Sequence, residues 1–403
     1  MTVFLLIIIY IAFISLGLPD SLLGAAWPAM SGDMGAPLSV AGVVSMIVAG
    51  GTIISSLTSN RLIHRFGTGR VMLVSVVATA LALMGFSFSS SLWMICLLAI
   101  PLGLGGGAVD AALNNYVALH YQARHMNWLH CMWGVGATAG PVILASSISG
   151  AGGWAGGYRT ISIIQFALVA ILACSMPLWR IVESRSLNNP AEGKSYVTHK
   201  QALRTPGVKL ALLTFFCFVG FEASAGLWAS SYLVTQKGLD AATAALWASM
   251  FFGGIMAGRA VSGVLSIKLN NKLMIRIGLG IALAASILLV LPLPAEFSMA
   301  GFILLGLGSA PLYPSMVHET PRRFGKVVSQ AAIGLQMACA YIGSTFLPPL
   351  EGLLSRWLSL ALIPWAILIL VCGGILMSEV LNRTIQRQKL SACDAEPKPR
   401  EAG

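Results

Sequence analysis

Charged residues are scarce in this 403-residue sequence, and their scarcity excludes most soluble folds. Asp, Glu, Lys and Arg together make up 10% of the chain, whereas hydrophobic residues make up 57% and the mean hydropathy is +0.82. A soluble domain carries roughly a quarter charged residues. We therefore expect lipid to be the solvent of this chain, which identifies it as an integral membrane protein.

The sequence also lacks the residue patterns of most catalytic and metal sites. Its seven cysteines are spread singly, so they form neither a disulfide framework nor a metal-binding spacing. There is no phosphate-binding Gly-Lys-Ser/Thr loop and no nucleophile elbow. We therefore expect no metal, no cofactor and no enzymatic activity.

Long apolar stretches dominate what is present. About twenty residues are needed to cross a bilayer as a helix, and twelve stretches reach that length. The sequence thus predicts an all-α membrane protein with twelve transmembrane helices, over residues 3–30, 38–60, 71–89, 92–119, 127–150, 159–179, 208–236, 243–267, 274–294, 297–318, 327–350 and 357–380.

One long polar segment interrupts the apolar stretches and divides them six plus six. It contains an Asn-Asn-Pro turn signal and five basic residues, which is typical of a linker outside the membrane. The last residues, rich in proline and mixed charge, are expected to be disordered. The predicted organisation is an N-terminal six-helix half over 1–180, a cytoplasmic linker over 181–206, a C-terminal six-helix half over 207–383 and a disordered cytoplasmic tail over 384–403.

The two halves share a weak internal repeat. Leu-Gly-Leu-Gly at 102–105 recurs at 305–308, an offset of 306 − 103 = 203 residues. Residues 59–62 and 262–265, and Gly140 and Gly343, are related by the same offset. Glycine-rich apolar helices resemble one another easily, but three matches at one offset favour a duplication. Two parallel six-helix repeats around a central site are an architecture of secondary transporters.

The distribution of basic residues predicts the topology. Of the 25 Lys and Arg residues, 21 fall in alternate loops and the tail, and only Arg159, Lys237 and Arg356 fall in the opposite loops. By the positive-inside rule, both termini should lie in the cytoplasm, with the chain a multi-pass protein of the cell (inner) membrane. The net charge of +11 is thus explained by topology, and we expect no nucleic-acid partner.

The three main acidic residues inside predicted spans are Asp20, Asp110 and Glu222. An ionised carboxylate there is unfavourable by about 2.5–3.5 kcal/mol even on lenient insertion scales. A proline precedes Asp20, and glycines precede Asp110 and Glu222, so each lies beside residues that loosen a helix. This pattern favours a water-filled cavity in which a partly desolvated carboxyl group can bind and release a proton. We predict Asp20, Asp110 and Glu222 as proton-coupling residues.

A purely structural role for these acids remains an alternative. Each could be neutralised by a cation on a neighbouring helix, and Arg259 is the candidate because it lies within a span. Arg259 stands beside Gly258, toward the predicted cytoplasmic end of its span. For Arg259 itself, the sequence therefore favours snorkelling or helix pairing over contact with a transported solute.

Polar and aromatic residues lie near the acids in the sequence. Sugar hydroxyl groups need paired donors and acceptors, while the C–H faces of a sugar ring pack on aromatic rings, so a mixture of amide, carboxylate and aromatic side chains suits a sugar. The same mixture suits other polar solutes, and single aromatics also serve packing. The predicted substrate-binding residues are Asn114, Asn115, His130, Trp133, Trp228, Gln336 and Tyr341.

The loop over residues 59–70 carries a family resemblance. It reads Ser-Asn-Arg-Leu-Ile-His-Arg-Phe-Gly-Thr-Gly-Arg and resembles the loop 2–3 signature of the major facilitator superfamily, Gly-x-Leu-Ala-Asp-Arg-x-Gly-Arg-Lys. His64 stands where the signature has Asp, and Asn60 where it has Gly, so the salt bridge credited to that Asp is not implied. The resemblance implies the major facilitator fold and predicts as gating-loop residues Arg65, Gly67 and Arg70.

Within that superfamily the chain looks most like the fucose-type sugar:proton symporter branch. Asp20 lies in a segment that resembles Asn-Asp-Ile-Leu of the branch's first helix, and Asp110 with Asn114 resembles its Glu-x-x-x-Asn in helix four. Residues 220–232 and 310–314 resemble its seventh and tenth helices. The resemblance implies that both acids take part in protonation and sugar binding, although Asp110 is one methylene shorter than the usual Glu.

Together these observations predict a secondary active transporter, with proton-coupled symport of a sugar-like solute by alternating access as the leading hypothesis. A proton-coupled exporter of drugs or metabolites is one alternative, because Gly134 to Pro141 loosely resembles an antiporter motif. A non-transporting membrane sensor with the same fold is another, because the loop signature is altered. The expected partners are a small polar solute, protons and the lipid bilayer, and the expected oligomeric state is a monomer.

Overall fold

The computed structural model describes residues 2–120, 123–186 and 199–395. Within these ranges the chain forms fourteen helices and no strand. The first seven are α1 (Thr2–Asp20), α2 (Leu22–Asp33), α3 (Val40–Phe66), α4 (Thr68–Phe88), α5 (Leu92–His120), α6 (Ala123–Ser149) and α7 (Gly153–Ser186). The others are α8 (His199–Arg204), α9 (Val208–Lys237), α10 (Ala241–Leu265), α11 (Asn271–Val290), α12 (Ala295–Ser309), α13 (Leu312–Leu358) and α14 (Leu362–Ala395).

The predicted all-α fold with twelve membrane-spanning segments is confirmed. Twelve segments of the described chain are long and apolar enough to cross a membrane. The first of them combines α1 and α2, which are interrupted at Ser21 directly after Pro19 and Asp20. Similarly, the tenth combines α12 with the beginning of α13, and Pro311 stands at the break. A proline stands beside each break, and proline weakens a helix because it removes a backbone donor and clashes with the preceding turn.

The helices extend further into the polar segments than the sequence suggested. The linker predicted from residue 181 begins as helix, since α7 continues to Ser186, and the short helix α8 lies near its end; residues 187–198 lie outside the described ranges. The tail predicted to be disordered from residue 384 is helical up to Ala395. Gln, Arg, Lys, Leu and Ala dominate that stretch, and these residues favour helix, whereas the first proline comes only at 397.

The internal repeat seen in the sequence is confirmed by backbone packing. In one half, Gly103 of α5 lies directly against the carbonyl of Val48 in α3, so a Cβ atom there would clash. In the other half, Gly306 of α12 lies in the same way against the carbonyl of Phe251 in α10. Both members of the second pair lie 203 residues after those of the first.

A second pair of contacts follows the same offset. A Cβ atom on Gly105 would lie 2.7 Å from the Ser75 carbonyl oxygen, and one on Gly308 would lie 2.7 Å from the Gly278 carbonyl oxygen. Helices in lipid gain their attraction from such close backbone approach, because little hydrophobic force acts between them. The duplication thus preserved the contacts on which helix packing depends.

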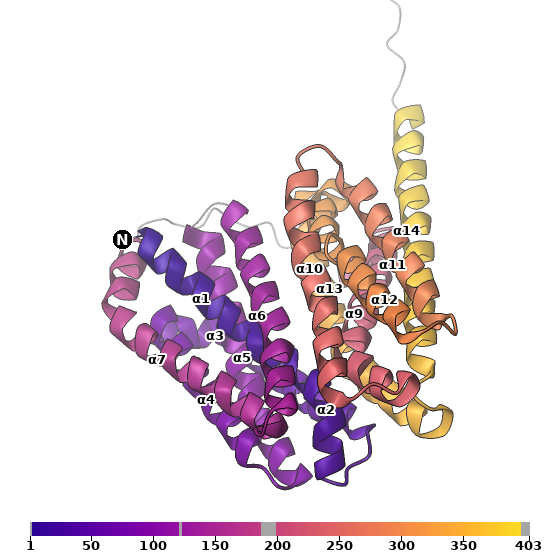
Figure 1. The fold of residues 1–403 in the computed structure, drawn as a ribbon. Helices are drawn as coiled ribbons and strands as arrows, with labels where there is room; N and C mark the ends of the chain where they lie inside the picture. Colours follow the sequence, from indigo (N-terminus) through magenta and orange to yellow (C-terminus); the bar gives the residue numbers. More distant parts are fainter. Residues whose placement is uncertain (1, 121–122, 187–198, 396–403) are drawn as a thin grey trace, which may run out of the picture.

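The helices form two groups, α1–α7 and α9–α14, which lean away from each other toward one end of the molecule (Figure 1). We call this the terminal end, because it carries the N-terminus, α8 and the last turns of α14. The other is the far end, with the loops between α2 and α3 and between α9 and α10. The largest buried apolar cluster includes far-end residues of both halves, whereas separate clusters lie within each half at the terminal end.

Several close contacts join the halves at the far end. Gly24 of α2 lies against the backbone of Gly226 in α9, and Ser230 Oγ donates a hydrogen bond of 3.2 Å to the Ala25 carbonyl. Gly42 of α3 lies against the backbone of Pro349 in α13. We call this set of contacts the far seam. It closes the far end between the halves.

Candidate functional site

Asp20 lies at the break between α1 and α2. Its Oδ2 accepts a hydrogen bond of 2.7 Å from Trp133 Nε1 on α6, and its side chain remains exposed. The break thus places a carboxyl group at the inner surface of the N-terminal half instead of in a continuous helix. The structure brings two predicted site residues, Asp20 and Trp133, into direct contact.

Asp110 and Asn114 face each other one turn apart on α5. Asn114 Nδ2 donates a hydrogen bond of 2.8 Å to Asp110 Oδ1 and one of 3.0 Å to the Asp110 carbonyl. Both side chains are half-buried. The i, i+4 spacing on one helix face fixes this pairing. Asn115, also predicted, lies on α5, but its side chain is outside those that the structure describes.

Glu222 supplies the third carboxyl group, from α9 in the C-terminal half. It is half-buried, interacts with the Ser309 side chain at the end of α12, and lies within electrostatic range of Arg259. Its Oε2 is buried without a hydrogen-bond partner of normal geometry. The carboxyl group is therefore not fully satisfied by the described protein groups.

Arg259 of α10 connects the two halves at the same level. Its Nη1 donates a hydrogen bond of 3.1 Å to the His130 carbonyl on α6, and its Cζ lies 5.1 Å from the centroid of the Trp133 ring. Because Trp133 also binds Asp20, a continuous set of contacts runs from Asp20 through Trp133 to Arg259. The guanidinium group joins α10 of one half to α6 of the other. This contact agrees with helix pairing, which was one of the two roles predicted for Arg259. The sequence analysis had named Arg259 as a possible counter-ion of the acids, and the structure places it within electrostatic range of Glu222.

Two tyrosines complete the centre. Tyr341 of α13 interacts with Ser56 of α3, which again joins the halves, and Tyr313 interacts electrostatically with Asp110. The offset of 203 relates Ser56 to Arg259, so the two contacts between the halves at this level start from equivalent positions. The same offset relates Asp110 to Tyr313. The sequence analysis had predicted Tyr341 but not Tyr313, although the repeat offset could have indicated it.

His130 lies at this centre through its ring as well as its carbonyl group. Its ring packs edge-on against Phe13, with 5.7 Å between the centroids, and lies 6.2 Å from the Tyr313 ring. The imidazole thus joins an aromatic group that includes a residue from each half. This placement allows packing and ligand contact alike.

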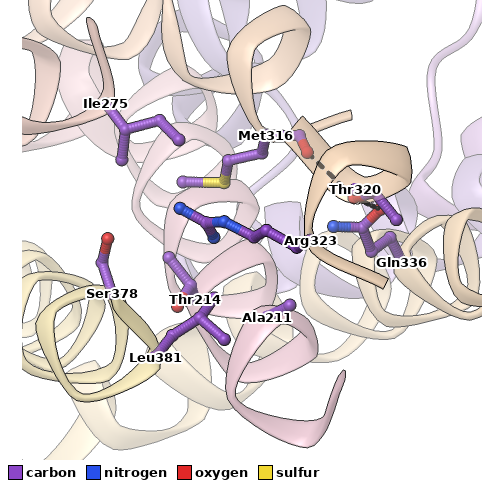
Figure 2. Close-up of a pocket in the computed structure, with 9 residues that line it drawn as sticks. All are labelled: Ala211, Thr214, Ile275, Met316, Thr320, Arg323, Gln336, Ser378 and Leu381. Carbon is purple, nitrogen blue, oxygen red and sulfur yellow. Dashed lines mark hydrogen bonds between the residues drawn. The ribbon is translucent and has the colours of Figure 1, made fainter. Parts of the chain in front are cut away.

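Two predicted substrate-binding residues lie elsewhere. Trp228 is fully buried among far-end residues of α9. Gln336 is 2% exposed, and its Oε1 accepts a hydrogen bond of 3.1 Å from Thr320 Oγ1. Figure 2 shows Gln336 at a small cavity near the terminal end, together with Arg323. The structure therefore does not bring Trp228 or Gln336 to the central group.

The predicted gating loop forms the turn between α3 and α4. Gly67 adopts φ 82°, ψ 155°, a conformation that favours glycine. Arg65 lies over the Phe66 ring, with its Cζ 5.3 Å from the centroid, and Arg70 is exposed on the first turn of α4. The side chains of Asn60 and His64, where the sequence departs from the signature, are outside those described.

Comparisons with known proteins give the family. The Major Facilitator Superfamily model matches residues 9–317. Bypass of stop codon protein 6 of Saccharomyces cerevisiae is 22% identical over 390 residues, which cover 88% of this chain and 77% of that protein. The glucose/mannose transporter GlcP of Bacillus subtilis is 22% identical over 272 residues, which cover 63% and 64% of the two chains.

A solved structure has the same fold. The crystal structure of a D-xylose-proton symporter superposes with a TM-score of 0.70 over 94% of this chain and 97% of that chain, at 14% sequence identity. The twelve spans, the central acidic group and the family match over most of the sequence agree with one another. The chain therefore belongs to the Major Facilitator Superfamily and is a membrane transporter of that family, as its sequence predicted.

Proposed function

We propose that this protein imports a small, polar, sugar-like solute together with protons by alternating access. The observation that carries the proposal is the charge of the centre: Asp110 lies within electrostatic range of Asp20, and Glu222 within range of Arg259, so three carboxyl groups share the centre with one guanidinium group. If all were ionised, the sum would be −3 + 1 = −2 in a region where one unpaired charge costs about 2.5–3.5 kcal/mol. Uptake of protons removes that cost.

Protonation of Asp110 would change what the site can bind. An ionised carboxylate offers only acceptors, whereas a protonated one offers a donor as well. Asn114, which donates to Asp110 Oδ1 over 2.8 Å, would keep this unprotonated oxygen, so that the O–H group on Oδ2 could donate to the solute. Proton binding and solute hydroxyl recognition would thus be linked at one helix face. Asp20 and Trp133 offer a second acceptor and an aromatic surface from the same half.

The contacts at the centre connect the halves, which suits the proposed movement. Arg259 joins α10 to α6, and Tyr341 joins α13 to α3. In the proposed cycle the two halves rock about this level, so that the far seam opens when the terminal end closes. By the positive-inside rule the terminal end would face the cytoplasm, and the closed far seam would correspond to an inward-facing state. We propose a monomer as the transporting unit.

The names of relatives support the solute class. One similar protein is a glucose/mannose transporter and one similar structure is a D-xylose-proton symporter. The proton gradient would supply the driving force, since moving one charge across 100 mV is worth about 2.3 kcal/mol.

Proton movement in proteoliposomes tests the proposal. The purified protein is reconstituted with a pH-sensitive dye and challenged with a panel of monosaccharides and then with other small polar solutes. We expect alkalinisation outside the vesicles to follow addition of one solute class, and the Asp110→Asn variant to lack it while retaining solute exchange. Acidification of the vesicle exterior would indicate an exporter instead, and no proton movement with any solute would favour a sensor.

A further inference from the structure

Glu351 is a buried acidic residue that lies within a span, away from the central group. Glu351 is on α13 near the far end and is 4% exposed. Its Oε1 lies 2.6 Å from Ser224 Oγ on α9. The predicted span ended at residue 350, whereas the span continues to Leu358, so Glu351 fell outside the prediction.

The two contacts of the Ser224 hydroxyl favour a proton on Glu351. Ser224 Oγ lies 2.8 Å from the Gly220 carbonyl oxygen as well as 2.6 Å from the carboxyl group. A hydroxyl group has one hydrogen, and a carbonyl oxygen can only accept. Both contacts are full hydrogen bonds when Ser224 donates to Gly220 and Glu351 donates to Ser224. Together with its burial, the geometry therefore favours a neutral, protonated Glu351.

The surroundings of Glu351 agree with a neutral group. From α9, Ser224 and the indole of Trp228 face it, and its electrostatic environment includes no charged group from the described parts of α3, α9, α13 or α14. Arg356, on the same helix, is exposed. The Oε2 atom is buried without a hydrogen-bond partner of normal geometry. An ionised carboxylate buried in this way would pay a large desolvation cost without compensation.

The far seam covers this carboxyl group. Gly352, the next residue, lies against the Ser39 carbonyl at the start of α3 and against the Trp228 ring. Two residues before Glu351, Pro349 lies against Gly42. The helix turn that carries Glu351 is therefore held between Trp228 of its own half and α3 of the other half. If the seam opens, α3 withdraws and water reaches the carboxyl group.

We propose that Glu351 is a proton-binding site that keeps the far seam closed: it binds one proton while the seam is closed and releases it to the far side when the seam opens. The proposal rests on the proposed alternating access only for the opening of the seam. Its proton is separate from those carried by the central acids, because the described hydrogen bonds of Glu351 end at Ser224 and Gly220. The site would make opening depend on the pH of the far side.

The sign of this dependence follows from linkage. The closed state holds one more proton than the open state, so a rise in pH favours opening, by at most about tenfold in the equilibrium constant per pH unit for one proton. Protonation from an acidic exterior would close the seam. In an importer, that step would favour the inward-facing state.

Infrared spectroscopy of the purified protein tests protonation without any solute. In the wild type we expect the carbonyl-stretch band of protonated carboxyl groups. In Glu351→Gln the intensity of this band should decrease by the contribution of one carboxyl group. Ser224→Ala should keep the band but shift its frequency, because the hydrogen bond is lost; this control also separates protonation from misfolding. An identical band in wild type and Glu351→Gln across the pH range would overturn the proposal.

Cysteine labelling tests the coupling to the seam. Ser39→Cys places a thiol on the α3 side of the seam, and its labelling by a membrane-impermeant maleimide is measured in proteoliposomes against pH, with the parent chain as background. Because maleimide reacts with the thiolate, whose fraction itself rises with pH, each labelling rate is divided by that of the same chain unfolded in denaturant at the same pH. We expect this ratio to increase with pH by up to tenfold per unit, and to be flat with pH in Ser39→Cys/Glu351→Gln. An equal slope in both would refute coupling. If labelling behaves as expected while no solute moves protons, the proposed symport fails and the Glu351 site stands.

Discussion

The terminal ends of the two halves use different chemistry at equivalent positions. In the N-terminal half, Tyr116 packs on Trp179, with ring centroids 5.0 Å apart. The residues 203 positions later are Glu319 and Asn382, and there Arg323 takes the place of the aromatic contact. Its Nη2 donates a hydrogen bond of 2.9 Å to Asn382 Oδ1, and its Nε lies 3.8 Å from Glu319 Oε1.

The difference extends beyond this pair. Also near the terminal end of the C-terminal half, Arg276 and Glu379 form a bidentate ion pair with distances of 2.6 and 2.7 Å. The positions 203 residues earlier hold Leu73 and Met176. Glycine contacts between helices are shared by the halves, whereas these end contacts are not. The close backbone contacts constrain both halves in the same way, because any Cβ atom at these glycines would clash. The side chains at the terminal ends can differ between the halves, as long as each finds packing or hydrogen-bond partners among its neighbours.

The largest expected effect concerns the centre, where Asp110 corresponds to Tyr313. A proton carried across 100 mV can support about fiftyfold accumulation of a solute. Asp110→Asn removes the proton and should reduce the accumulation ratio to about one, whereas Tyr313→Phe, which removes only a hydroxyl group, should keep accumulation above one. Proton-driven uptake of the solute identified in the dye assay measures the accumulation ratio of each variant, and counterflow measures whether the variant still exchanges the solute. Normal accumulation by Asp110→Asn would contradict the assignment.

The two terminal ends should respond differently to loss of their central residue. The Trp179→Ala substitution should lower the free energy of unfolding by about 3–5 kcal/mol, because Trp179 is a large aromatic residue that is only 1% exposed. Arg323→Ala leaves Glu319 buried and unpaired, which costs about 3 kcal/mol. Thermal unfolding in detergent measures both.

A second substitution distinguishes the two mechanisms. Adding Glu319→Gln should restore part of the stability lost in Arg323→Ala, because it removes the unpaired charge, and should not rescue Trp179→Ala. Equal effects of Glu319→Gln in both backgrounds would show that the two ends do not differ in the way proposed.

The glycine contacts should respond alike in the two halves. Gly103→Ala and Gly306→Ala place a methyl group against a carbonyl of the neighbouring helix, so each should destabilise by about 1–3 kcal/mol through overpacking. Gly50→Ala and Gly280→Ala, where a Cβ atom meets nothing within 4 Å, are the controls and should be neutral or stabilising. A large difference between Gly103→Ala and Gly306→Ala would argue against equivalent packing.

The smallest expected effect is at the first residues of α3 and α10, which begin equivalent spans. Asp240 caps α10 by accepting hydrogen bonds of 3.0 Å from the backbone N–H groups of Ala242 and Thr243, whereas Ser39 makes no side-chain cap at α3. Asp240→Ala should cost about 1 kcal/mol, and Ser39→Ala close to nothing. Thermal unfolding near neutral pH measures both.

The effect of Asp240 should depend on pH. Its hydrogen bonds to Thr243 hold the pKa of the Asp240 carboxyl group below its usual value. The stabilisation is therefore present above the unfolded pKa of about 3.9 and is lost as pH falls through the lower folded value. A stability difference between wild type and Asp240→Ala that persists at pH 2 would contradict this assignment.

Much of the fold and part of the site could be predicted from the sequence. Runs of apolar residues gave the twelve spans because a bilayer imposes a fixed length, and the Leu-Gly-Leu-Gly repeat correctly indicated equivalent helix contacts. Of the predicted site residues, Asp20, Trp133, Asp110 and Asn114 form two contacting pairs, and Asp110 with Asn114 follows from helical spacing alone. Their proton-coupling and binding roles remain predictions.

Other residues could not be placed from the sequence. Trp228 and Gln336 had suitable chemistry, but each faces away from the central group, and the direction of a helix face depends on what packs against it. Arg259 was named as a possible counter-ion of the acids and as a snorkelling or helix-pairing residue. Its contacts with Trp133 and the His130 carbonyl could not be predicted, because those residues lie more than a hundred positions away in the sequence. Glu351 was missed because the predicted span ended at residue 350, near two prolines and a glycine, whereas the span continues to Leu358.

What the sequence by itself determined are properties that depend on local composition: the number of spans, the duplication, and the presence of acids where lipid disfavours them. The tertiary structure alone decided which of those acids share one site and which carboxyl group the far seam covers. The physical reason is that the cost of a buried charge depends on its neighbours in space, and those neighbours come from helices of both halves.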